Sequence, residues 1–203
     1  MTVLLDTRVP GGPKQCPDPE LLRSLFDYDP STGELVWKAK NYRSHIAGTP
    51  DRSGYIRVIL NKQSWPAHRL IWAIHYGVEP PALIDHVNGD TADNRIENLR
   101  AASRTQNNAN SAVSSRNASG FKGVSRHKAT GKWQAYIKVN GKGKHLGVFS
   151  DPVEAHAAYC AAAAETFGDF ARPAIRALPP LSDSKPGLAD APSNGSAPAG
   201  EER

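Results

Sequence analysis

The feature that most constrains the fold is an alternating run, WQAYIKV at residues 133–139, followed directly by Asn140-Gly141. Successive side chains of a strand point to opposite faces, so the apolar residues of this run share one face. Asn-Gly is a strong hairpin signal, which makes KHLGVF (residues 144–149) a returning strand. FKGVSRH (residues 121–127) precedes the turn KATGK and supplies another strand. This stretch therefore predicts three strands. The apolar face would carry Trp133, Ala135, Ile137 and Val139.

A helix is predicted after the third strand. Asp151 is a capping acid, Pro152 suits the first turn, and Glu154 follows three residues after the cap. The helix AHAAYCAAAAETF would end at Gly168, and its many alanines would let it pack closely on the sheet. Beyond about Ala177 the chain is rich in Pro, Ala, Ser and Gly, which is typical of a disordered tail.

The first half of the chain has a different organisation. Residues 1–17 are expected to form a flexible arm, followed by a short helix at Pro19–Phe26. TGELVWKA and GYIRVILN are predicted strands, and AHRLIWAIHYG is a predicted helix that ends at Gly77. Residues 111–119 are rich in Ser and Asn and are interpreted as a linker.

The two cysteines, Cys16 and Cys160, lie far apart and form no CxxC pair. This argues against a disulfide scaffold and a thiolate zinc site, and it favours a reducing cytoplasm. The sequence has neither a membrane-spanning stretch nor the pattern of a signal peptide. We expect an intracellular protein with no membrane partner.

Charge is distributed unevenly along the chain. Between Asn98 and Ser150 there is no Asp or Glu, whereas ten basic residues occur there. Such a one-signed segment repels itself unless it meets a polyanion, so nucleic acid is the expected partner. The alternative is a solvated basic face with no partner. The basic residues are Arg100, Arg104, Arg116, Lys122, Arg126, Lys128, Lys132, Lys138, Lys142 and Lys144.

Residues 84–108 hold the groups that phosphodiester hydrolysis needs. His86 can take a proton from water near neutral pH, and Arg104 can contact a phosphate. The carboxylate of Asp85 and the amide oxygen of Asn107 are hard ligands that suit Mg²⁺. Adjacent strand residues point to opposite faces, so Asp85 and His86 can share a site only at a strand end or a kink. The intervening Asn-Gly-Asp and Asp-Asn-Arg are also ordinary turn sequences.

The run HRLIWAIHYG…IDHVNGDTADNRIENLRAASRTQNNAN resembles phage HNH homing endonucleases, in the subgroup with Asn at the third motif position. The resemblance covers about residues 21–110 and implies a ββα-metal fold with one divalent ion, Mg²⁺ or alternatively Mn²⁺. It implies that His86 is the general base, that Asp85 and Asn107 are metal ligands, and that Asn98 pins the hairpin loop. Arg104 would contact phosphate, and Asn108 is an alternative to Asn107 as ligand. His68-Arg69 could brace the site or touch a backbone phosphate, and we favour the bracing role.

Residues 120–173 resemble the AP2 DNA-binding domain, in which a three-stranded antiparallel sheet packs on one helix and enters the major groove. Together with the HNH resemblance and the composition of the tail, this predicts an α+β protein. It would have a nuclease domain at 18–110, a linker at 111–119, this second domain at 120–173 and a tail at 174–203. The AP2 resemblance also implies contacts to double-stranded DNA from one face of the sheet. These would be made by Lys122, Arg126, His127, Lys132, Tyr136, Lys138 and His145.

The predicted function is a metal-dependent DNA endonuclease of the phage homing type, acting in the cytoplasm of the bacterial host. With one site per chain, a monomer would nick one strand, and cutting both would take two copies. A monomer or weak dimer is expected, without an obligate protein partner. One alternative is a non-catalytic DNA-binding regulator that keeps the HNH scaffold. Another is an RNA-directed nuclease or an RNA-binding protein, which is less favoured because recognition of single strands depends on exposed stacking aromatic residues.

Overall fold

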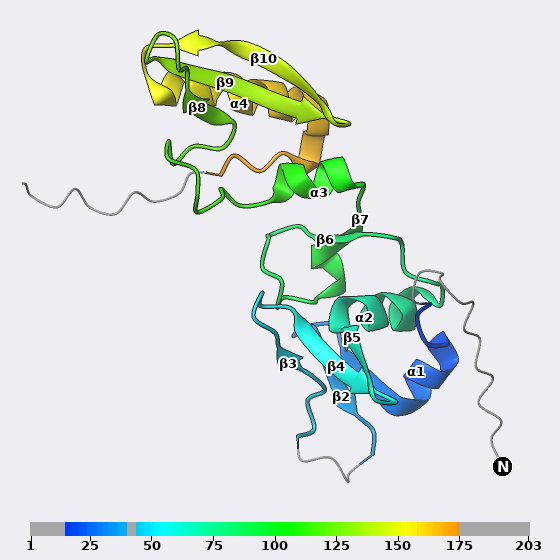
Figure 1. Cartoon of the computed structure of the whole chain (residues 1–203). Helices are drawn as coiled ribbons and strands as arrows, with labels where there is room; N and C mark the ends of the chain where they lie inside the picture. The colour runs from blue at the N-terminus through cyan, green and yellow to red at the C-terminus, as the bar shows by residue number, and fades with distance from the viewer. Residues whose placement is uncertain (1–14, 40–43, 175–203) are drawn as a thin grey trace, which may run out of the picture.

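The computed structural model describes residues 15–39 and 44–174, which form an N-terminal and a C-terminal part connected through the short helix α3 (Figure 1). No helix within these two ranges is both long and apolar enough to cross a membrane. The predicted arm at 1–17 lies outside the described residues except for its last three positions. There Cys16 is buried in the core, so the arm ends earlier than predicted. The predicted tail lies outside them except for Ala174.

The N-terminal part consists of two helices and two small sheets. Asp18 caps the first helix by accepting hydrogen bonds from the backbone N–H groups of Glu20 and Leu21. The elements are α1 (Pro19–Leu25), β1 (Phe26–Asp29), β2 (Glu34–Trp37), β3 (Thr49–Pro50), β4 (Ile56–Leu60), β5 (Gln63–Pro66) and α2 (Ala67–Tyr76). Strands β1 and β2 pair antiparallel, and β3, β4 and β5 form a second antiparallel sheet.

The first predicted helix is one residue too long at its C-terminal end. Phe26 leaves the helix in an extended conformation and begins β1, where it pairs with Trp37. The two rings lie 4.3 Å apart between centroids, and Phe26 is almost fully buried. Burial of this aromatic pair outweighs the local preference for continuing the helix. Together with Leu22, Leu35, Val58, Leu70 and Ile71 it belongs to the main core.

The central segment contains a short hairpin followed by a helix. Its elements are β6 (Ile84–His86), a 3₁₀ turn η1 (Ile96–Asn98), β7 (Leu99–Ala101) and α3 (Arg104–Asn110). Strands β6 and β7 are antiparallel, with Asp85 opposite Arg100 and His86 opposite Leu99. This is the ββα arrangement that the sequence resemblance predicts for residues 84–110.

The C-terminal part is a three-stranded antiparallel sheet in the order β10-β9-β8, covered on one face by α4 (Figure 1). Its elements are β8 (Val124–Arg126), β9 (Trp133–Val139), β10 (Lys142–Phe149), α4 (Pro152–Phe167) and the 3₁₀ turn η2 (Gly168–Phe170). Ala135 and Ile137 are buried towards α4, whereas Tyr136 and Lys138 are exposed, as the alternation predicts. Asp151 caps α4 and Gly168 ends it, also as predicted.

Candidate active site

Local hydrogen bonds fix the start of α3, which directly follows the hairpin. Ser103 begins α3 with a capping box: its hydroxyl accepts from the backbone N–H of Gln106, and the Gln106 side chain accepts from the backbone N–H of Ser103. Helix α3 contacts β6 directly. The side chains of a seven-residue helix are thereby held against the strand that carries Asp85 and His86.

Asp85 is buried, and its carboxylate is held by hydrogen bonds from Arg100 and Asn110 and by an ion pair with Arg100. Arg100 lies directly opposite on β7, with its Nε and one terminal nitrogen each 2.9 Å from Oδ2. The side-chain nitrogen of Asn110 lies 3.0 Å from both carboxylate oxygens and also donates to the backbone oxygen of His86 at 2.7 Å. The Asn side chain that reaches Asp85 therefore belongs to Asn110, one helical turn beyond the predicted Asn107. Sequence reasoning missed Asn110, although its i+3 spacing from Asn107 places both on one helix face.

His86 is buried, and its ring orientation is set by a hydrogen bond. Its Nε2 lies 3.1 Å from the side-chain oxygen of Asn94, whose amide nitrogen donates to the carbonyl of Ala92. Because the amide presents oxygen to the ring, the network assigns the proton to Nε2 and leaves the lone pair on Nδ1. Nδ1 is then the nitrogen that can accept a proton from water. Asn94 was interpreted as a turn residue, and its role became apparent only from the folded loop.

Two further rings surround the imidazole of His86. The ring centroids of His68 and Tyr55 lie 5.2 Å and 5.9 Å from it. Burial lowers the pKa of His68 to about 3, helped by the neighbouring His86, Arg69 and Arg57, so His68 is neutral near physiological pH. Arg69 donates to the carbonyls of Pro80 and Pro81. His68 therefore contacts the His86 ring, whereas Arg69 binds the segment that precedes β6.

Asn98 fixes the loop between β6 and β7. Its side-chain oxygen accepts from the backbone N–H of Asn88 at 2.9 Å, and its nitrogen donates to the carbonyl of Asp93 at 2.7 Å. These are the loop hydrogen bonds expected of Asn98. Tyr28 of β1 anchors the same loop, because its hydroxyl accepts from the N–H of Ile96 at 2.8 Å. The loop is therefore tied to the N-terminal sheet as well as to itself.

A pocket of about 210 Å³ opens between the hairpin, α3 and the C-terminal segment. Both Asp85 and His86 line it, so ending β6 at His86 allows adjacent residues to share one site. Asn107 also lines the pocket, whereas among the described residues the exposed Arg104 and Asn108 do not. The lining residues are Tyr55, Asp85, His86, Gly89, Thr91, Asn107, Asn110, Ser111, Ala112 and Arg172.

The donor set of this pocket fits a hard cation that keeps most of its water. Across residues 15–39 and 44–174 no group of three or more His, Cys, Asp or Glu side chains is placed to hold a metal. The pocket does bring together one carboxylate, Asp85, and the side chain of Asn107. Two oxygen ligands supplemented by water and a substrate phosphate are the coordination that Mg²⁺ commonly adopts.

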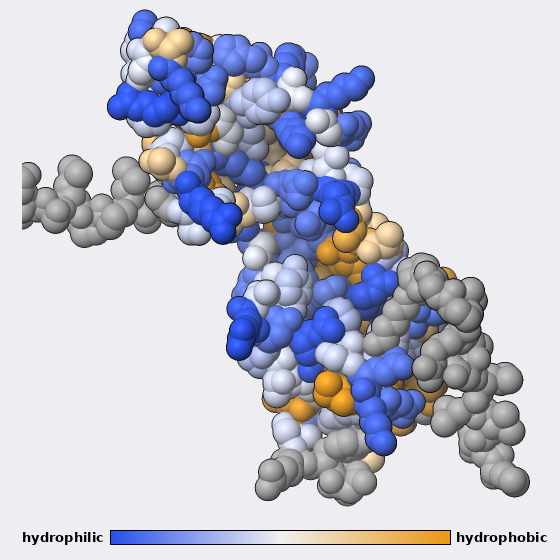
Figure 2. Space-filling model, viewed as in Figure 1, coloured by the Kyte–Doolittle hydropathy of each residue, from blue (hydrophilic) through white to orange (hydrophobic). Residues whose placement is uncertain are grey.

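The predicted DNA-contacting residues fall into two groups in the C-terminal part. Tyr136, Lys138 and His145 are exposed on the face of the sheet opposite α4, with Tyr136 directly across from His145. The hydroxyl of Tyr136 lies over Gly143, where any Cβ would be only 1.2 Å away. Figure 2 shows mostly hydrophilic side chains over this part of the molecule.

The other four predicted residues lie outside β9 and β10. Arg126 stacks on Trp133, with 4.8 Å from its guanidinium carbon to the ring centroid, and donates to the carbonyl of Gly131. His127 bonds Thr130 within the turn, and Lys132 is exposed beside it. Lys122 was predicted to face outward from the sheet, but its side chain instead binds the end of α3.

Lys122 is engaged inside the junction between the two parts. Its ammonium donates to the carbonyls of Ala109 and Ser111 at the end of α3, at 2.5 Å and 2.6 Å. Burial, with a smaller contribution from Arg172, lowers the pKa of Lys122 to about 8. The local strand pattern could not reveal this contact, because its acceptors lie in another part of the chain.

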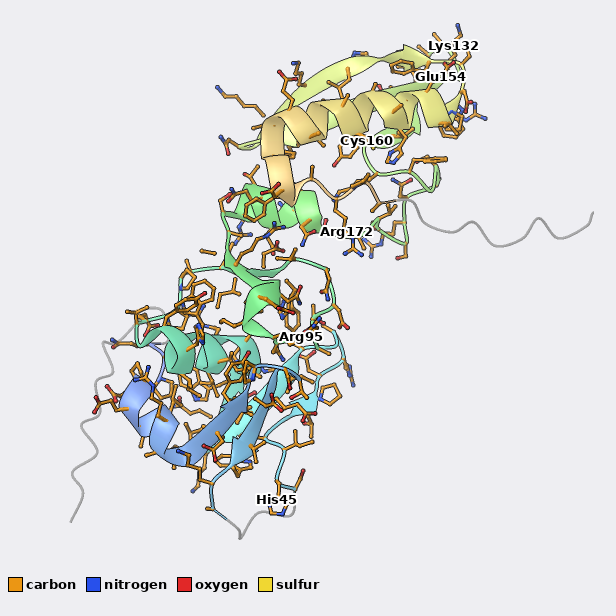
Figure 3. The ribbon with its side chains drawn as sticks, turned by 180° about the vertical axis from the view of Figure 1, so that it is seen from behind. His45, Arg95, Lys132, Glu154, Cys160 and Arg172 are labelled. Atoms are coloured by element: carbon orange, nitrogen blue, oxygen red, sulfur yellow. The ribbon has the colours of Figure 1, made fainter. Side chains whose placement is uncertain are left out.

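The segment after α4 returns to the hairpin and α3. Arg100 donates to the carbonyl of Asp169 at 3.0 Å and lies 3.7 Å from the ring centroid of Phe170. The backbone N–H of Arg172 donates to the carbonyl of Ala109 at 3.4 Å, and its side chain lines the pocket. Figure 3 shows Arg172 between α3 and the N-terminal part. The sequence assigned this segment to the second domain alone and gave no signal of its return.

Comparison with known proteins gives two matches. A family model described as HNH endonuclease matches residues 66–109, which include α2, the hairpin and most of α3. Protein 3.8 of Escherichia phage T7 is 31% identical over 106 residues, which cover 52% of this chain and 87% of that protein. No solved structure gives a significant match.

Proposed function

Because the chain belongs to the family of phage T7 Protein 3.8 and carries an HNH endonuclease domain at residues 66–109, we propose that it is a metal-dependent DNA endonuclease of the phage homing type. The observation that carries the proposal is the convergence of Asp85, His86 and Asn107 on one pocket. A basic imidazole and two hard-oxygen ligands are the groups that hydrolysis of a phosphodiester requires.

His86 is the general base of the proposed reaction. Its Nδ1 takes a proton from a water molecule while the water oxygen attacks phosphorus. The bond from phosphorus to the 3′ oxygen breaks, and that oxygen takes a proton from solvent, which leaves a 3′ hydroxyl opposite a 5′ phosphate. Asn94 keeps the proton on Nε2, so that the free nitrogen is available at the start of each cycle. The imidazolium then returns its proton to solvent.

Asp85 and Asn107 would hold the divalent ion, which we propose to be Mg²⁺, with Mn²⁺ as an alternative. When bound, such an ion supplies positive charge to the phosphate oxygens and to the leaving 3′ oxygen. Asn98 positions the loop that carries the site, and Arg104, at the first turn of α3, would contact a flanking phosphate. Asn107 is the better candidate ligand than Asn108, because only Asn107 lines the pocket.

Duplex DNA is the proposed substrate, held by an AP2-like C-terminal module. The exposed sheet face offers Tyr136, Lys138 and His145, and the adjoining turn adds Arg126, His127 and Lys132. Lysine contacts phosphate as a point charge, so this face favours docking over base discrimination. One site per chain implies nicking by a monomer, with the bacterial cytoplasm as the setting.

Conversion of supercoiled plasmid to the nicked form tests the proposal. We expect nicking with Mg²⁺, none with EDTA, and a loss of at least about 10²-fold in His86→Ala, the usual scale for a general base. His75→Ala is the matched control, because His75 is an exposed histidine on α2 whose ring contacts Tyr76. Equal nicking by wild type and His86→Ala would refute the assignment.

A non-catalytic DNA-binding regulator is the second candidate, and one observation favours it. Both carboxylate oxygens of Asp85 already accept from Asn110, and Oδ2 also pairs with Arg100. A regulator would retard DNA equally as wild type and as His86→Ala, and neither protein would nick it with Mg²⁺ or Mn²⁺.

A further inference from the structure

Three arginines lie around the pocket, and their guanidinium groups have different surroundings. Arg100 is committed to Asp85, to the carbonyl of Asp169 and to the ring of Phe170. Arg104 is exposed and does not line the pocket. Arg172 lines it, and it reaches there from the segment that follows α4. Of the three, Arg172 is the one available to a molecule inside the pocket.

The Arg172 side chain is held close to the loop that follows His86. A Cβ at Gly89 would lie 1.7 Å from one of its terminal nitrogens, so a side chain there would displace the guanidinium, and the φ of +72° independently favours glycine. The backbone of the same residue is anchored to Ala109 of α3. Within the described part of the chain, no acceptor takes a hydrogen bond or ion pair from the guanidinium. A half-buried guanidinium that has no acceptor favours an anionic ligand.

The net charge of the pocket also favours an anionic ligand. Asp85 is the one carboxylate among the lining residues, and Arg100 already pairs with it. With His86 in the neutral form that the proposed base requires, Arg172 is the charged side chain that remains among the lining residues. The positive charge of Arg172 also lowers the pKa of Lys122, after the larger contribution of burial. The pocket as a whole therefore has an excess of positive charge near the proposed base.

We infer that Arg172 binds the scissile phosphate of DNA, so that the segment after α4 supplies a substrate-binding residue to the HNH pocket. The identity of the anion rests on the proposed nuclease function. A guanidinium can donate two parallel hydrogen bonds to a phosphate, which suits this position better than the exposed Arg104. The C-terminal module then contributes to catalysis as well as to docking.

Binding without cleavage gives the first test. Affinity of the full-length protein for a short DNA duplex is measured in EDTA over a range of salt, for wild type, Arg172→Gln and Arg23→Gln. Each phosphate contact contributes about 0.9 to the slope of log K against log salt, so Arg172→Gln should reduce the slope by about 1. Arg23→Gln removes the same charge from α1, where Arg23 binds the carbonyl of Ile74, and should leave the slope unchanged.

Cleavage gives the second test. We expect Arg172→Gln to nick plasmid with Mg²⁺ about 10²-fold more slowly than wild type, the usual loss when a donor to the developing charge is removed. Arg172→Lys should keep the salt slope but recover only part of the rate. Should Arg172→Gln not fold, Gly89→Ala displaces the same guanidinium, with Gly141→Ala as control. Gly141 has a similar φ of +81°, and no atom beyond its chain neighbours lies within 4 Å of a Cβ there.

The outcomes separate this inference from the proposed function. An unchanged slope and an unchanged rate in Arg172→Gln would overturn it, even if wild type cuts DNA. A wild-type protein that never nicks DNA, with a slope that still falls in Arg172→Gln, would refute the nuclease and support the phosphate contact. An unchanged slope in a protein that does not nick would refute both.

Discussion

Single hydrogen bonds decide the chemistry that this pocket can perform. The hydrogen bond from His86 Nε2 to the Asn94 oxygen leaves Nδ1 as the nitrogen that acts as base. The Asn94 amide is neutral, so this partner does not add a charge beside the imidazole. Asn94 itself is held by its own hydrogen bond to Ala92 and by burial. Its substitution therefore tests the orientation of the base without removing the base.

Asn94→Asp is expected to slow cleavage at neutral pH by about tenfold and to move the acidic limb of the rate profile to higher pH. A carboxylate next to Nε2 stabilises the protonated imidazole, so a larger share of the enzyme would lack a free base. The measurement is the single-turnover nicking rate between pH 5.5 and 9. A profile of unchanged position would show that Asn94 does not act through His86.

Burial of His68 should make the protein less stable as the pH falls. The pKa of His68 is about 3 in the folded chain against an ordinary 6.5, so between these values the unfolded chain binds more protons. Unfolding free energy should then fall as pH drops from 6.5 towards 3, by up to about 1.4 kcal/mol per pH unit from this group. Urea unfolding of wild type and His68→Gln at pH 7 and pH 4.5 measures it. Equal pH dependence in the two proteins would contradict the assignment.

Some residues of the site could be predicted from the sequence, and others could not. Asp85, His86, Asn98 and Asn107 could be proposed from the sequence because the motif places them in a fixed order along one short segment. Arg172 could not, because its position depends on how α4 ends and on what the following residues pack against. Asn110 was hidden for a different reason, since Asn107 and Asn108 already offered a ligand at the expected spacing.

At the level of helices and strands, the sequence predicts the C-terminal sheet better than the two sheets of the N-terminal part. Alternation, the Asn140-Gly141 turn and the Asp151 cap are local signals, and each is found where it was expected. Strands β1, β3 and β5 carry no such signals. β5 contains Pro66, and β3 consists of Thr49 and Pro50 alone, so their pairing depends on β4 and on burial of neighbouring side chains.

Ser103→Ala should reduce both stability and cleavage, because the capping box of Ser103 orients the helix that carries Asn107 and Asn110. Loss of an N-cap hydroxyl costs about 1 kcal/mol. Asp18→Ala removes a comparable cap from α1 and is the control. Urea unfolding should show similar losses in both variants, and plasmid nicking at 25 °C should fall several-fold only in Ser103→Ala. Equal nicking by the two variants would mean that α3 does not position the site.

Lys138→Ala tests the outer face of the C-terminal sheet. If Lys138 contacts a phosphate, its removal should weaken duplex binding on every sequence and lower the salt slope by about 1. Lys38→Ala is the charge-matched control, because Lys38 is paired with Asp27 in the N-terminal part. A salt slope equal to that of wild type would place the DNA elsewhere on the molecule.

For the whole molecule, the junction between the two parts is the main feature. Lys122 joins it through two carbonyls of the α3 end, and Thr105 of α3 reaches Asn140 of the β9–β10 turn. These polar contacts hold the C-terminal part against the helix of the nuclease motif. The parts of the chain on either side of the predicted linker therefore contact each other through these residues.

Lys122→Met should change how stability depends on alkaline pH. Folding lowers the pKa of Lys122 from 10.5 to about 8, so the unfolded chain binds more protons between these values. The unfolding free energy of wild type should therefore rise with pH across this interval relative to Lys122→Met. Urea unfolding at pH 7.5 and pH 9.5 gives the comparison. A constant difference between the two proteins would show that the ammonium is not desolvated.

The return of the chain from α4 to α3 has a consequence for synthesis. Translation produces His86 and its hairpin first and the guanidinium at position 172 only after the whole of the second module. A nascent chain still attached to the ribosome would thus hold a base without the cation that receives the phosphate. Cutting ability would arise late, once the growing polypeptide has closed back on itself.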